Sequence, residues 1–189
     1  MISLEEWKDA KELTTADEVF PCLEELIIRR CYKLRYLPDS LHTCVSLQKL
    51  VVRECYEMRS LPGVSSIIPS TSSIQDYYPS LQKLKLIWWG THQSLPILNQ
   101  IQYFTALKIL WIERFHEIID QSLPEWLGNL SYLQQLYIVS CYNLVHLPTE
   151  EAMRSLTQLK TLIIYDCPRY EDNERIKISH IPLVKINDL

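Results

Sequence analysis

The chain has 189 residues and a mass of 22.3 kDa, a length that suits one domain. Hydrophobic residues make up 47% and charged residues 22%, which excludes a disordered or fibrous chain. The net charge of −4 gives no overall positive field, so we expect no nucleic-acid partner. Only three glycines occur, and they are too scattered to build a glycine-rich phosphate loop.

The beginning of the chain shows no targeting signal. Residues 1–8 lack the apolar core of a secretion signal, and no later run of about 18 apolar residues could span a bilayer. We therefore expect a cytoplasmic protein without a membrane span. The segment from Leu4 to Trp7 fits the second half of a repeat with no strand before it, so we expect residues 1–19 to form a partial repeat of a longer or truncated protein.

Internal repeats dominate the rest of the sequence. Six segments superpose on the pattern Leu-x-x-Leu-x-aliphatic, and a shorter seventh segment starts at Leu183. A cysteine or aromatic residue follows three positions after the aliphatic residue, and most units end in Leu-Pro. The unit LxxLxIxxCxxLxxLP is a leucine-rich repeat. The first leucines of the six full segments are Leu23, Leu47, Leu81, Leu107, Leu133 and Leu159.

Each unit predicts a short parallel strand whose fourth and sixth positions point inward, followed by a turn at the cysteine. The predicted fold is therefore α/β: a right-handed, horseshoe-shaped leucine-rich repeat solenoid with a parallel concave sheet and an irregular, partly helical convex side. Short convex helices are expected within 124–130 and 148–156, where proline and early acidic residues suit a helical first turn.

We divide the single domain 1–189 by these periods. Repeat two is longer than the common 26 residues, and its extra segment is rich in serine and proline, so a mobile insertion is expected at 62–79. The charged segment after the last cysteine suits a C-terminal cap. The repeats cover 20–45, 46–79, 80–105, 106–131 and 132–157, and the last repeat with its cap covers 158–189.

A binding surface is expected where the third, fifth, seventh and eighth positions of each repeat face the concave side or its edge. These positions are basic in the early repeats and aromatic in the middle and late ones. Tryptophan, tyrosine and arginine dominate binding hot spots. An alternative is that the aromatic side chains only cover the sheet or contact a domain absent from this chain. The candidate protein-binding residues are Arg29, Arg30, Arg53, Lys83, Lys85, Trp88, Trp111, Arg114, Tyr137 and Tyr165.

Catalytic chemistry finds no support in the sequence. The five histidines fall in different repeats, and none belongs to a nucleophile or metal motif. The turn cysteines lie one repeat apart, which predicts buried thiols on neighbouring strands that donate weakly to turn carbonyls. A disulfide between them is geometrically conceivable, but the expected compartment opposes it. We therefore expect no enzyme, no metal and no cofactor.

Three segments carry a resemblance to a known family: 20–31 (FPCLEELIIRRC), 122–130 (SLPEWLGNL) and 178–186 (ISHIPLVKI). With its turn cysteines, Leu-Pro endings and irregular units, the chain resembles the C-terminal leucine-rich repeats of plant intracellular immune receptors of the coiled-coil, nucleotide-binding class. The resemblance implies a recognition and autoinhibitory region. Its implied partners are a pathogen effector or guarded host protein and the nucleotide-binding domain of the parent receptor.

Two other protein classes stay open. The sequence Asn129-Leu130-Ser131 matches a glycosylation site and favours an extracellular receptor ectodomain, although no signal or membrane span accompanies it. Cysteine-containing repeats also occur in substrate-recognition subunits of ubiquitin ligases, but those repeats usually lack the Leu-Pro ending.

Overall fold

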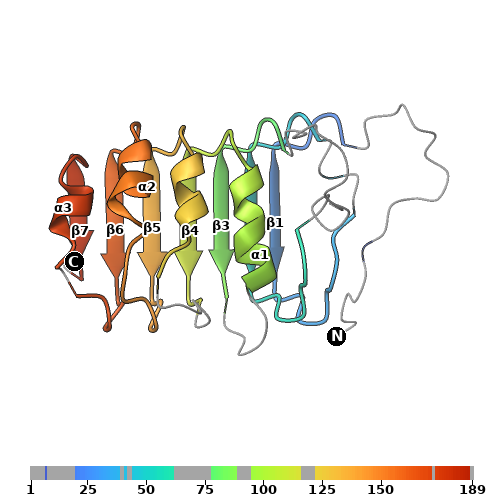
Figure 1. The fold of residues 1–189 in the computed structure, drawn as a ribbon. Coiled ribbons are helices and arrows are strands. Elements are labelled where there is room, and N and C mark those ends of the chain that lie inside the picture. The colour runs from blue at the N-terminus through green and yellow to red at the C-terminus, as the bar shows by residue number, and fades with distance from the viewer. Residues whose placement is uncertain are drawn as a thin grey trace, which may run out of the picture.

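The computed structural model describes residues 7, 20–38, 41, 44–61, 78–88, 95–115, 122–171 and 173–187. Seven strands form one open parallel sheet, in chain order (Figure 1). The predicted leucine-rich repeat solenoid is confirmed, with a strand at every predicted Leu-x-x-Leu segment. The strands are β1 (Glu25–Arg29), β2 (Lys49–Arg53), β3 (Lys83–Ile87), β4 (Ile109–Glu113), β5 (Gln135–Val139), β6 (Thr161–Tyr165) and β7 (Leu183–Ile186).

Short helices cover one side of this sheet (Figure 1). The helices expected within 124–130 and 148–156 are confirmed as η3 and α2. In α2 the Thr149 hydroxyl accepts a hydrogen bond from the Ala152 amide at 3.3 Å, the side-chain cap that satisfies a free amide of the first turn. The helices are α1 (Leu95–Gln100), η2 (Ile101–Tyr103), η3 (Glu125–Asn129), α2 (Glu150–Ser155) and α3 (Arg175–Ile178).

The two faces of the sheet differ because strand residues alternate in direction. From β1 to β6, equal positions of neighbouring repeats are paired, as Leu110 is with Leu136. The predicted start of the seventh segment is wrong by two residues, because Leu183 pairs with Thr161 at the third position and is 45% exposed. We call the face made by the fourth and sixth positions the inner face; from β2 to β6 its residues are at most 1% exposed. The third, fifth and seventh positions form the outer face. Burying each inner leucine stabilises the fold by about 2 kcal/mol.

A further apolar position lies three residues before the first leucine of each repeat, and the sequence analysis missed it. The amide of the leucine donates to the carbonyl of this residue, which closes a turn before each of the strands β1 to β6. One such residue, Tyr78, packs edge-on against Phe104 with ring centroids 5.2 Å apart. Tyr78 falls within the expected insertion 62–79, of which 62–77 lie outside the described residues. From β2 to β6 the position is held by Cys44, Tyr78, Phe104, Leu130 and Leu156, all buried.

The turn cysteines form the expected ladder of thiols. Each donates to the carbonyl oxygen two residues earlier, at sulfur–oxygen distances of 3.6 Å for Cys31, 3.4 Å for Cys55, 3.5 Å for Cys141 and 3.4 Å for Cys167. The predicted weak thiol bonds are confirmed, and all six cysteines, including Cys22 and Cys44, are free. Burial raises the pKa of Cys55 to about 11, so this thiol is neutral at physiological pH.

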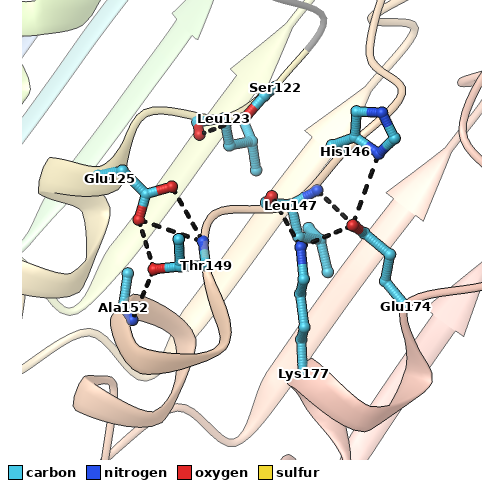
Figure 2. A network of polar contacts seen from close by, with 9 residues as sticks. All are labelled: Ser122, Leu123, Glu125, His146, Leu147, Thr149, Ala152, Glu174 and Lys177. Carbon is cyan, nitrogen blue, oxygen red and sulfur yellow. Dashed lines mark hydrogen bonds and ion pairs between the residues drawn. The ribbon is translucent and has the colours of Figure 1, made fainter.

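Carboxylates and amides connect neighbouring repeats on the helical side (Figure 2). Glu125 accepts hydrogen bonds from the Thr149 amide and hydroxyl, the latter at 2.6 Å. Glu174 accepts from the Leu147 amide at 2.6 Å and pairs with Lys177 at 2.6 Å. Both carboxylates therefore satisfy backbone groups at the Leu-Pro ending of a repeat.

The hydrogen bond to the amide of the leucine before proline recurs near the other end of the sheet, where its acceptor is an amide side chain. There, Gln100 Oε1 accepts a hydrogen bond from the Leu61 amide at 2.6 Å. Leu61 and Leu147 hold the same position in their repeats, just before the proline. One acceptor from a following convex helix is thus enough to hold the Leu-Pro segment, whether or not that acceptor is charged.

The helices described are all short. None is long and apolar enough to cross a membrane.

Candidate functional site

The basic part of the outer face lies on β1 to β3. Arg29 and Lys83 are exposed on β1 and β3. On the neighbouring positions Lys49 pairs with Glu25 at 2.7 Å. Arg53 is the last residue of β2. Its guanidinium and that of Arg30 bind the same carboxylate, which brings the two side chains together. These strands therefore bring together most of the basic residues that the sequence singled out.

That shared carboxylate belongs to Glu54, which is 8% exposed. It accepts hydrogen bonds from Arg30 Nε at 3.1 Å and Arg53 Nε at 2.8 Å. The hydrogen bond from Arg53, assisted by Arg30, holds the pKa of Glu54 below its usual value despite partial burial. A single anion thus holds two cationic side chains in place. Glu54 is not among the residues predicted from the sequence, because a contact between residues 24 positions apart, such as Arg30 and Glu54, leaves no local sequence signal.

The aromatic part of the outer face lies on β4 and β5. The rings of Trp111 and Tyr137 are stacked, with centroids 4.7 Å apart and planes at 22°. Lys85 of β3 lies over the Trp111 ring, with Nζ 3.6 Å from the centroid. Desolvation lowers the pKa of Lys85, and the charge of Arg53 lowers it further, while Glu113 opposes both. We call Lys85, Trp111 and Tyr137 the aromatic shelf.

Polar side chains fix both rings of the aromatic shelf. Trp111 Nε1 donates to Glu113 at 2.9 Å, and the Tyr137 hydroxyl donates to Gln135 at 3.0 Å. Each partner lies two positions away on the same strand, where side chains share a face. The sequence shows this i, i+2 spacing and could have been used to predict both hydrogen bonds, which were missed. The shelf is therefore held in place before any partner binds.

The expectation that Trp88 is exposed on this surface is wrong. Trp88 is 1% exposed and packs in the core against Phe115, with ring centroids 6.0 Å apart. In most repeats the residue after the strand adopts a positive φ, as Arg114 does at 63°. Trp88 does not, so its side chain turns inward although its amide still donates to Glu113. Burial of the indole removes a large apolar area from water, but it leaves Trp88 Nε1 without a hydrogen-bond partner among the described residues.

The remaining candidates lie apart from the aromatic shelf. Tyr165 on β6 pairs with Val139 and not with Tyr137. It lines a separate open hollow of about 300 Å³ with Asp166 and Asn187. Arg114 follows β4 on the turn side of the sheet. The described residues contain no group of three or more histidine, cysteine or acidic side chains arranged to hold a metal ion.

A family model describes this chain well. Residues 3–168 match the leucine-rich repeats of RPS2-like plant disease resistance proteins. The chain belongs to this family. The match agrees with the resemblance carried by the turn cysteines and Leu-Pro endings, and the leucine-rich repeat fold supports a protein-interaction module. No curated protein matches the sequence.

A solved structure supports the fold of this chain. The leucine-rich repeat domain of the type III effector XopL matches with a TM-score of 0.57 and 22% identity, over 88% of this chain. The chain spans 62% of the length of that domain. Internalin C2 from Listeria monocytogenes matches with a TM-score of 0.42 and 15% identity, over 82% of this chain and 72% of the internalin.

Proposed function

We propose that this chain is the recognition and autoinhibitory region of a cytoplasmic disease resistance receptor of the coiled-coil, nucleotide-binding class. Its partners are a pathogen effector or guarded host protein and the nucleotide-binding domain of the same receptor. It works as a non-enzymatic protein-interaction module. The family match supports the plant resistance class over an extracellular ectodomain or a ubiquitin ligase subunit.

The observation that carries the proposal is the aromatic shelf on the outer face. Trp111 and Tyr137 are only half-buried, although every inner position of the same strands is fully buried. Large rings held by hydrogen bonds and left partly open to solvent are typical of binding hot spots, since little side-chain entropy is lost when a partner covers them.

The test uses the chain and the nucleotide-binding domain expressed as separate polypeptides in leaf tissue. The double variant Trp111→Ala/Tyr137→Ala should lose most of the co-precipitated nucleotide-binding domain while remaining folded, with a cooperative thermal transition at a lower temperature. The matched control is Tyr36→Ala/Tyr132→Ala, which removes two exposed tyrosines outside the strands. Equal co-precipitation by both folded variants would contradict the proposed role of the outer face.

The receptor class has its own test. The genomic sequence upstream of Met1 should encode a nucleotide-binding ATPase region in the same reading frame. A secretion signal in that position would overturn the proposed class and the cytoplasmic location, and would favour the extracellular alternative suggested by Asn129.

A further inference from the structure

The outer face of β1 to β3, with the residue that follows each strand, is strongly basic in an acidic chain. It carries six basic side chains against two carboxylates, whereas the whole chain has a net charge of −4. One of the carboxylates, Glu25, is engaged by Lys49, and the other, Glu54, serves two arginines. The excess of positive charge is therefore local and favours an anionic partner. The basic residues are Arg29, Arg30, Lys49, Arg53, Lys83 and Lys85.

Glu54 leaves the binding edges of its two arginines open. Arg30 and Arg53 both contact it through Nε, which leaves the terminal Nη groups available to a ligand. The side chains are 69% and 41% exposed. Guanidinium groups bind carboxylates through paired N–H donors, and here the orientation is already fixed by Glu54. We call Arg30 and Arg53 the arginine pair.

Lys85 connects the arginine pair to the two rings of the aromatic shelf. It lies on β3, between Arg53 of β2 and Trp111 of β4 in the order of the sheet. Its ammonium group is already partly desolvated and placed over the indole ring. One continuous surface therefore passes from fixed cations to fixed rings.

The spacing of the strands sets the length of the occupant. Neighbouring strands lie about 4.8 Å apart, so the arginine pair, which lies at the ends of β1 and β2, is separated by three strand spacings, about 14 Å, from the ring stack between β4 and β5. An extended peptide covers about 3.3 Å per residue, so this distance corresponds to about four residues.

We propose that the outer face binds an extended acidic peptide segment that runs across the strands. Its aspartate or glutamate carboxylates bind the arginine pair, and an aromatic or large aliphatic side chain about four residues away packs on the aromatic shelf. The proposal rests on the proposed function, whose protein partner it describes by chemistry. Glu113 beside Trp111 disfavours a continuous polyanion, because a second carboxylate or phosphate at the shelf would meet a like charge.

The experiment measures binding of fluorescent 12-residue peptides to the full chain by anisotropy. The probe contains Asp-Glu-Asp followed by a phenylalanine four residues after the glutamate. One control peptide replaces the acids with Asn and Gln, and another moves the phenylalanine four residues further on. We expect each change to weaken binding at least tenfold, and we expect the affinity of the probe to fall as salt is raised.

The variants separate the surface from general charge. Arg30→Gln/Arg53→Gln should weaken binding at least tenfold, whereas Arg154→Gln/Arg169→Gln, which removes two exposed arginines elsewhere, should change it less than twofold. Because the first variant leaves Glu54 without its cations, Lys85→Met provides a second test that breaks no ion pair with Glu54. Circular dichroism checks that each variant is folded.

Unchanged binding in a folded Arg30→Gln/Arg53→Gln or Lys85→Met variant would overturn the proposal. So would equal or tighter binding of a single-stranded oligonucleotide that competes with the peptide. The peptide assay contains no other receptor domain, so its outcome is independent of the co-precipitation test. If the chain binds the peptide but does not co-precipitate the nucleotide-binding domain, only the proposed function is contradicted. If it co-precipitates that domain but does not bind the peptide, only this inference is contradicted.

Discussion

Strands β1 to β3 and β4 to β6 have the same backbone arrangement but carry different side chains on the outer face. On β1 to β3 the outer face is basic and held by ion pairs, as around Glu54. On β4 to β6 it is aromatic, and its rings are held by hydrogen bonds to one carboxylate and one amide, as at Trp111 and Tyr137. The inner positions of both halves are aliphatic, and all are buried except Leu26 of β1, which is half-buried. In this solenoid the fold therefore constrains one face and leaves the other free for recognition.

The largest expected effect tests whether the inner faces of the two halves are equivalent. Leu50→Ala in the basic half and Leu136→Ala in the aromatic half each remove a side chain that is at most 1% exposed. Each should lower the free energy of unfolding by about 3 kcal/mol, as measured by urea denaturation. A loss below about 1 kcal/mol in only one variant would show that the two halves are packed differently.

The second effect concerns the acceptors that join repeats on the helical side. Glu174→Ala leaves the Leu147 amide without its partner and should cost about 2 kcal/mol. Glu174→Gln should cost less than about 1 kcal/mol, because Gln100 serves Leu61 in the same way. Thermal unfolding measures both. Equal losses would indicate that the ion pair with Lys177 matters more than the backbone bond.

The third effect isolates the ring stack of the aromatic half. A double-mutant cycle of Trp111→Ala and Tyr137→Ala should give a coupling energy of about 1 kcal/mol. The same cycle on Tyr32 and Tyr56, whose exposed rings stack at 5.3 Å in the basic half, provides the comparison. Additive losses at Trp111 and Tyr137 would contradict a stack that is formed in solution.

The smallest effect is a pH dependence confined to the basic half. The pKa of Glu54 is lowered in the fold, so its stabilisation is present above the unfolded value of about 4.5 and is lost as the pH falls through the folded value. Glu54→Gln should therefore reduce the loss of stability between pH 6 and pH 3. An identical acid transition in wild type and variant would show that the arginine pair is not held by this carboxylate.

The inner face could be predicted from the sequence because its repeat is periodic. The leucine spacing alone identified every strand and the register of β1 to β6, and the turn cysteines identified their weak hydrogen bonds. It misplaced β7 by two residues, because Leu183 pairs with Thr161 and not with the first leucine of the preceding repeat. The apolar position before each strand was missed because Cys44, Tyr78 and Phe104 differ too much in size and chemistry to show a pattern.

The outer face could be predicted only in part. Alternation placed Arg53, Lys85, Trp111 and Tyr137 on one surface, because direction follows from strand position. The inward turn of Trp88 could not be read the same way, since it depends on whether one backbone angle after β3 is positive. The role of Glu54 also required the structure, because pairing between residues of different repeats depends on side-chain reach.

The central claim is that the inner face stabilises the fold and the outer face binds a partner. Side-chain footprinting with hydroxyl radicals tests it most directly. In the free chain Trp111 and Tyr137 should be modified, and the buried Trp88 should be protected. The acidic, phenylalanine-containing peptide should then protect Trp111 and Tyr137 but leave Tyr132, which is 54% exposed, unchanged. Modification of Trp88 as fast as Trp111, or no protection of Trp111 and Tyr137 by the peptide, would contradict this account.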